Sequence, residues 1–246
     1  AVFACRCEPS QAAPGDVASL RQAIEQTERV FPQQYDGERF LHRLDELDAR
    51  LAERPESKLT KRALEDLQHE ALLSNPVVGA QPILFVQRKQ YKPDHHNTAT
   101  LFQVGEINEG SFDGGSALCT LDLSRDGKVT TLLESPEGVI RDPEVHFDGE
   151  RIVFSMRRDP NDDYHIYTIN VDGSGLRQLT HAPRVSDIDP LFLPNGDIVF
   201  SSTREPKFCM CNRHIMANLF RMEGDGANIH QLGKSTLFEG HGALLP

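Results

Sequence analysis

The stretch Asp142–Asp159, DPEVHFDGERIVFSMRRD, has a counterpart later in the chain, DPLFLPNGDIVFSSTRE at Asp189–Glu205. We expect the two to align without a gap, Asp-Pro on Asp-Pro and Ile-Val-Phe-Ser on Ile-Val-Phe-Ser, and the Asp-Pro pairs lie 47 residues apart. Each stretch is followed by a second matching run, HIYTINVDGSGLRQLT at His165–Thr180 and NLFRMEGDGANIHQLG at Asn218–Gly233. A period of roughly 40 to 50 residues with four strands in each unit is typical of a β-propeller blade.

The repeat extends in both directions. An earlier and less regular unit runs from Ile83 through GGSALCTLDLSRDGKVTTLL to Leu133, and the last residues, HGALLP, align with the opening of the Asp189 unit. We therefore expect a mainly β chain that forms a partial β-propeller of about three blades plus the start of a fourth. Because so few blades cannot close a ring, we also expect the remainder of the propeller, or another subunit, to cover the bare strand edges.

The region before the blades has a different pattern. Residues 16–76 carry apolar side chains at helical spacing, which predicts three short helices after a flexible N-terminus at residues 1–15. The blades would then occupy residues 82–246. The apolar positions that define the three helical faces are Val17, Leu20, Ile24 and Phe31, then Phe40, Leu44, Leu47 and Leu51, then Leu59, Ala63, Leu67 and Ala71.

Net charge limits the classes of partner that the chain could bind, and the N-terminal residues indicate its compartment. The 246 residues carry a net charge of −11, which argues against binding to nucleic acid or to an anionic membrane surface. No apolar run approaches the roughly 18 residues of a membrane span. Val2-Phe3-Ala4 before Cys5 resembles the tail of a cleaved export signal or a lipoprotein box, which predicts a periplasmic or otherwise exported protein.

Equivalent positions of the repeat hold the first candidate site. Asp142, Asp189 and His241 align with one another, at a position that we expect to open the innermost strand of each blade. Inner strands of successive blades gather around the axial channel, so these side chains are expected to approach each other and to hold a metal ion or a polar ligand. The alternative for Asp142 and Asp189 is a structural role, because aspartate before proline is also a common turn device.

The second candidate site is the stretch FCMCNRH in the insertion after the second strand of the Asp189 unit. It contains Cys209, Cys211 and His214, and the preceding unit has no cysteine at that place. Thiolate and imidazole ligands suit zinc or copper, so these residues with His241 form a candidate metal site. A disulfide to Cys119 or to another part of the protein, or simply free thiols, are the alternatives for the cysteines, and His214 has a structural alternative.

Several stretches resemble known families. IYTINVDGSGLRQLT and SDIDPLFLPNGDIVFSSTR look like the units of TolB-like propellers. LQHEALLSNPVV, ILFVQRKQY and FCMCNRHIMANLFRMEGDGANIHQLGKSTLFEGHGALLP resemble proteins related to the alpha subunit of hydrazine synthase. That second resemblance implies an exported redox protein in which an N-terminal propeller precedes domains with c-type haem, and a zinc ion lies near a haem-based active site. It favours Cys211 and His241 as zinc ligands, with a redox protein as partner.

The chain departs from that family in one respect. It contains no Cys-x-x-Cys-His motif, so a covalent haem would be attached outside these residues. The resemblance therefore implies a propeller segment that scaffolds a metal or haem site completed elsewhere, and leaves open whether the whole protein is a haem-dependent oxidoreductase. The alternative function is a non-catalytic TolB-like module that binds a protein or a carbohydrate at the axial mouth.

Overall fold

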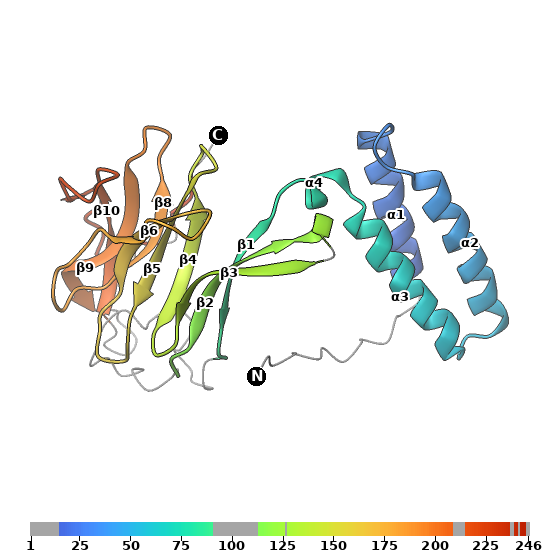
Figure 1. Ribbon diagram of the computed structural model, residues 1–246, viewed down its shortest axis with the longest axis horizontal. Coiled ribbons are helices and arrows are strands. Elements are labelled where there is room, and N and C mark those ends of the chain that lie inside the picture. Colours follow the sequence, from blue (N-terminus) through green and yellow to red (C-terminus); the bar gives the residue numbers. More distant parts are fainter. Residues whose placement is uncertain are drawn as a thin grey trace. The chain divides into compact units, whose positions relative to one another are not determined.

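The computed structural model describes residues 15–90, 113–125, 127–208, 215–236, 239–240 and 242–244. The chain divides into two compact units (Figure 1). The first contains the helices and Asp122–Lys128, and the second contains residues 83–121 and 129–246, which include the sheets. Among the described residues, no helix is long and apolar enough to cross a membrane.

The first unit is built from helices, three of which begin at clear capping residues. These are α1 (Gly15–Val30), α2 (Gly37–Glu53), α3 (Lys58–Leu73) and the single turn α4 (Pro76–Gly79). The side chains of Asp36, Ser57 and Asn75 accept hydrogen bonds from main-chain N–H groups at the start of α2, α3 and α4. Such caps satisfy donors that a helix cannot satisfy internally.

The apolar faces of the helices form their own core, with one difference from the sequence prediction. Leu20 and Ile24 of α1 pack with Phe40 and Leu44 of α2, as the spacing predicts. On α3, however, the buried residues are Leu64, Leu67 and Ala71, whereas Leu59 is 82% exposed. Both sets fit a helical period, and the packing against α1 and α2 selects the second.

The second unit consists of three antiparallel sheets. Two have four strands in the same order, β4-β5-β6-β7 and β8-β9-β10-β11, and the third has three, β1-β2-β3. Their bounds are β1 Ile83–Arg88, β2 Ser116–Asp122, β3 Lys128–Ser135, β4 Val139–Val145, β5 Arg151–Arg157, β6 His165–Asn170, β7 Arg177–Gln178, β8 Asp187–Phe192, β9 Ile198–Phe208, β10 Ile215–Met222 and β11 His230–Gln231; the short 3₁₀ turn η2, Leu123–Arg125, follows β2.

The sheets lie one after another like blades, which confirms the mainly β, antiparallel part of the sequence prediction. β1 packs against β4, and β4 and β5 pack against β8, so successive sheets are neighbours. The adjacent positions of β4 and β8 can be followed in Figure 1. The three described sheets do not close into a ring, and the total number of blades stays a prediction.

The repeat is reproduced strand by strand, with a one-residue difference in one turn. Ile152 stands opposite Ile169, and Ile198 stands opposite Met222 at the same place in the next sheet. The β4–β5 turn is closed by a bond from His146 N to Arg151 O, and the β8–β9 turn by Leu193 N to Asp197 O, one residue shorter. The expectation of an alignment without a gap is therefore wrong: the two units need one gap, within the turn.

Apolar side chains fill the space between adjacent sheets. Val153 and Ile166 from the second sheet pack with Phe192, Phe200 and others from the third. A second cluster, which includes Leu118, Ile140 and Phe154, lies between the first and second sheets. Full burial of one such side chain is worth about 1.5–3 kcal/mol, so these two clusters are what hold the sheets in sequence.

Candidate functional site

Asp142 and Asp189 lie at bulges in the first strands of two neighbouring sheets. Their backbone φ angles are 52° and 51°, in the left-handed region that aspartate tolerates better than most residues. The pairing register shifts at each of them, between Arg141 and Glu144 in β4 and between Ile188 and Leu191 in β8. The expectation that Asp142 and Asp189 open their strands is therefore wrong: both lie within the strand, where a bulge re-aims the side chain.

Arg141 joins the two carboxylates. Its Nε donates to Asp142 Oδ2 at 2.5 Å, and its terminal nitrogen lies 3.5 Å from Asp189 Oδ1. The guanidinium carbon is 5.6 Å from the centre of the buried Tyr164 ring, a distance suited to a cation–π contact. Burial lowers the pKa of Arg141, but Asp142, Tyr164 and Asp189 outweigh it and raise that pKa above its ordinary value, so the side chain is permanently charged.

Two acidic side chains of β4 bind the main chain of β8. Asp189 N donates to Asp142 Oδ2 at 3.3 Å, and Phe192 N donates to Glu144 Oε1 at 3.2 Å. Burial raises the pKa of Glu144, and the bond from Phe192 partly offsets that rise. Asp142 therefore links two sheets through its side chain, which is a more specific structural role than the local turn considered from the sequence.

A cavity of about 260 Å³ opens at this place. It is lined by residues from three successive positions of the repeat: Asp142, Pro143, Glu144, Asp189, Pro190, Leu191 and Gly242. Gly242 lies against β8, because a Cβ placed on it would be 3.0 Å from Leu191 Cδ2. It follows His241 directly in the sequence.

The four predicted metal ligands Cys209, Cys211, His214 and His241 lie outside the described residues, so their role stays a prediction. In the part of the chain that the structure describes, no three His, Cys, Asp or Glu side chains are grouped as a metal would need. Cys119 is a buried free thiol, and because Cys209 and Cys211 lie outside the described residues, the disulfide alternative considered from the sequence stays a prediction. Arg141 already supplies a cation to Asp142 and Asp189, which makes this pair an ion-paired cluster and not an open ligand set.

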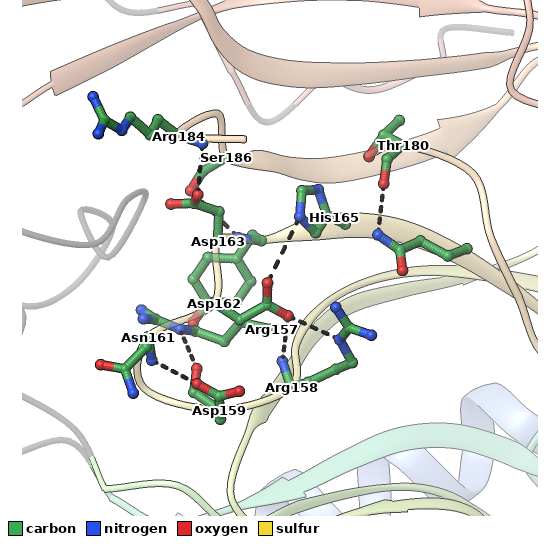
Figure 2. A network of polar contacts seen from close by, with 12 residues as sticks. Arg157, Arg158, Asp159, Asn161, Asp162, Asp163, His165, Thr180, Arg184 and Ser186 are labelled. Carbon is green, nitrogen blue, oxygen red and sulfur yellow. Dashed lines mark hydrogen bonds and ion pairs between the residues drawn. The ribbon is translucent and has the colours of Figure 1, made fainter. Parts of the chain in front are cut away.

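The acidic run Asp159–Asp163 only loosely resembles a calcium loop, and the structure gives its side chains local partners (Figure 2). Asp159 accepts from Asn161 N at 2.7 Å, Asp162 accepts from Arg158 N and Nε at 3.1 Å, and Asp163 accepts from Arg184 N at 2.9 Å. The first two residues' bonds shape the β5–β6 turn, and the bond from Arg184 joins that turn to the β7–β8 connection. The neighbouring His165 is buried, which lowers its pKa.

The sequence did not point to two charged side chains of the first strands, Arg141 in β4 and Asp187 in β8. Arg141 aligns with Ile188 in the next repeat, so the repeat gives no signal for it. Asp187 aligns with Ile140 in the same way, yet it is fully buried and accepts from Arg204 at 3.1 and 3.3 Å. Burial raises the pKa of Asp187 to about 6, and Arg204 only partly opposes that rise.

Comparison with known proteins finds only distant similarity to solved structures. No family model matches the chain, and no curated protein matches it. Among solved structures, the chain is 20% identical to Kuenenia stuttgartiensis hydrazine synthase, with a TM-score of 0.42 over 57% of this chain and 20% of that one. It is 21% identical to a putative TolB from Agrobacterium tumefaciens, with a TM-score of 0.38 over 50% of this chain and 46% of that one. An oligogalacturonate lyase in complex with manganese is 15% identical, with a TM-score of 0.40 over 63% of this chain and 39% of that one.

The chain thus spans about a fifth of the hydrazine synthase chain and less than half of the other two. At these identities the likeness concerns the fold alone. The assignment of blade-like sheets rests on the strand order and register within this chain.

Proposed function

We propose that this chain is the propeller segment of an exported, hydrazine synthase alpha-like redox protein, and that it scaffolds a zinc site at the cavity of Asp142 and Asp189. The observation that carries the proposal is that three successive repeat positions line one cavity, the third being Gly242 beside His241. In the proposed site, Cys211 and His241 are the first zinc ligands, with Cys209 and His214 as further candidates.

The two aspartates would support the metal indirectly. Because Arg141 pairs with Asp142 and Asp189, these carboxylates fit the position of partners that orient a ligating imidazole better than that of direct ligands. A zinc ion held in this way would act as a Lewis acid toward a bound ligand. The described residues do not fit covalent haem, since the sequence has no Cys-x-x-Cys-His motif, and we derive no step through haem.

The metal site is tested by elemental analysis of the full chain after dialysis against zinc. On the order of one zinc ion per chain is expected, and it should be lost from the Cys211→Ser and His241→Ala variants. Asp189→Asn is expected to weaken zinc binding by the about 10- to 100-fold typical of an indirect partner. His69→Ala, on the exposed side of α3, is the matched control and should keep the metal.

A second candidate function follows from the same ion pairs. If Asp142 and Asp189 serve only to join two sheets through Arg141, the chain is a non-catalytic module that binds a protein or carbohydrate partner at the cavity mouth. A chain that binds no zinc, or that keeps zinc in both the Cys211→Ser and His241→Ala variants, would exclude the metal site and leave this second function.

A further inference from the structure

In the part of the chain that the structure describes, the sheet β1-β2-β3 has the register of a blade but contains one strand fewer than the other two sheets. Ile83 of β1 stands opposite Leu121 of β2, in the same pattern as Ile152 opposite Ile169 and Ile198 opposite Met222. β1 and β2 therefore correspond to β5 and β6, the second and third strands of the next sheet, and β3 corresponds to β7. The missing strand is the counterpart of β4 and β8, the first strand of each complete sheet.

Exposure along β1 supports this assignment. Ile83 is 44% exposed, whereas its counterparts Ile152 and Ile198 are 1% and 0% exposed. The next three residues of β1, Leu84 to Val86, are only half-buried, although all three counterparts in β5 are fully buried. β1 packs on β4 as β5 packs on β8, so two differences remain: among the described residues, no strand lies at the edge where β5 has β4, and no sheet lies on the other face of β1.

Among the described residues, no strand pairs with the second edge of β1, and an edge of this kind is a template for backbone pairing. In the complete sheet, Ser155, Met156 and Arg157 of β5 pair through this edge with Arg141, Ile140 and Val139 of β4. β1 is the edge strand of its sheet, so among the described residues the corresponding edge of β1 has no neighbouring strand. An exposed edge of this kind binds an added strand through main-chain hydrogen bonds, and side-chain pockets give the specificity.

The bonds between β4 and β8 indicate the chemistry of the added strand. Asp142 caps the N–H of Asp189, and Glu144 caps the N–H of Phe192, each residue of β4 binding the residue 47 or 48 positions later. By the same geometry, a strand before β4 would present one acidic side chain to Asp142 N and another to Val145 N. Its pattern would be that of β4 itself, Asp-Pro-Glu within an apolar strand.

No further segment of this chain has that pattern. The sequence contains three Asp-Pro pairs, and those at Asp142 and Asp189 are used in β4 and β8. The third, Asp159-Pro160, lies in the β5–β6 turn, where both carbonyl groups accept from the buried Arg157. In a second copy of the chain the same strands are engaged in the same way, so a second copy has no free strand of this type to offer.

We infer that the edge of β1 at Ile83–Gln87 is a docking site for an extended strand with the Asp-Pro-Glu pattern, supplied from outside these 246 residues. The added strand completes the first sheet and caps the main chain of β4. This inference rests on none of the proposed zinc ligands, although the added strand would also reach the main chain of Asp142, which lines the cavity. Protection of β1 by the peptide and loss of zinc from the Cys211→Ser and His241→Ala variants are separate measurements, so one proposal can fail without the other.

The probe is a 12-residue peptide that copies residues 137–148, EGVIRDPEVHFD, added to the full chain. Hydrogen exchange is expected to slow by about tenfold or more at the amides of Ile83–Gln87 and at Asp142, with no change in β7 or β11. A peptide with alanine in place of the aspartate of the Asp-Pro pair should bind about tenfold more weakly, because it cannot cap Asp142 N. A scrambled peptide should give no protection.

Two matched variants test whether the peptide binds to β1. Ile83→Asp puts a charge where the peptide presents the equivalent of Val145, which stands opposite Ile152 in the complete sheet, and should abolish protection. Val129→Asp introduces the same charge at a similarly exposed position of β3 and should leave protection intact. Absence of protection, both with free peptide and with peptide tethered by a flexible linker, would overturn the inference. So would a dimer of the chain in which β1 is already protected and which Ile83→Asp dissociates.

Discussion

Replacing Arg141 with methionine is expected to lower the free energy of unfolding by about 3 kcal/mol or more at neutral pH. The Arg141 side chain is 12% exposed, and it is the described cation between Asp142 and Asp189. Methionine fills a similar volume but leaves two carboxylates close together without a counter-charge. Removing one partner from a buried ion pair costs far more than the pair itself contributes, because the remaining charge is stranded.

The measurement is urea unfolding followed by circular dichroism, with Arg151→Met as the matched control. The Arg151 side chain is 42% exposed and pairs with Asp148 at the surface, so its replacement should cost less than about 1 kcal/mol. Adding Asp142→Asn and Asp189→Asn to Arg141→Met should restore most of the lost stability. A loss below about 1 kcal/mol for Arg141→Met alone would mean that the cluster is solvated and contributes little.

The ionisation of Asp187 is expected to make the free energy of unfolding depend strongly on pH. Its folded pKa of about 6 lies above the ordinary value of 3.8, because burial outweighs the attraction of Arg204. The folded protein therefore holds the proton more tightly than the unfolded chain does. The stabilisation from the neutral carboxyl is fully present below about pH 4 and is lost as the pH rises through about 6.

We expect the difference in free energy of unfolding between the wild type and the Asp187→Asn variant to change with pH. At pH 4 the two should be similar, because a protonated carboxyl and an amide have nearly the same shape. Between pH 4 and pH 7.5 the free energy of unfolding of the wild type should fall by about 3 kcal/mol relative to the variant.

Asp197→Asn provides a control of opposite sign. Hydrogen bonds from Arg221 lower the pKa of Asp197, so its contribution is present at neutral pH and is lost in acid. Relative to the wild type, this variant should therefore lose stability as the pH rises. If the wild type and Asp187→Asn respond equally to pH between 4 and 7.5, the proposed titration of Asp187 is wrong.

The repeat in the sequence predicted the second unit well because both copies contain the same strands and turns. Ile-Val-Phe-Ser forms the second strand of each complete sheet, and the glycines at 149 and 196 have φ angles of 74° and 86°, as the turns require. The approach of Asp142 to Asp189 also follows from the repeat, since equivalent positions of adjacent sheets are neighbours. The bulges at Asp142 and Asp189 do not follow from the repeat, because alternation of apolar residues carries no signal for an inserted residue.

Other features depend on contacts that a single sequence does not encode. Arg141 and Asp187 have apolar counterparts in the neighbouring repeat, so only the packing of β4 on β8 and of β8 on β9 reveals their partners. The buried face of α3 depends likewise on the helices around it. The incomplete first sheet became visible only from the register of β1 with β2, since β1 alone resembles any apolar strand.

Consecutive repeats form neighbouring sheets whose Asp-Pro bulges share Arg141 at one cavity. A double-mutant cycle between Arg141→Met and Asp189→Asn measures this arrangement, because the two residues are 48 positions apart in the chain and interact only if the sheets are adjacent. We predict a coupling free energy of about 1–3 kcal/mol. A coupling below about 0.5 kcal/mol, the range of independent sites, would contradict the shared cavity.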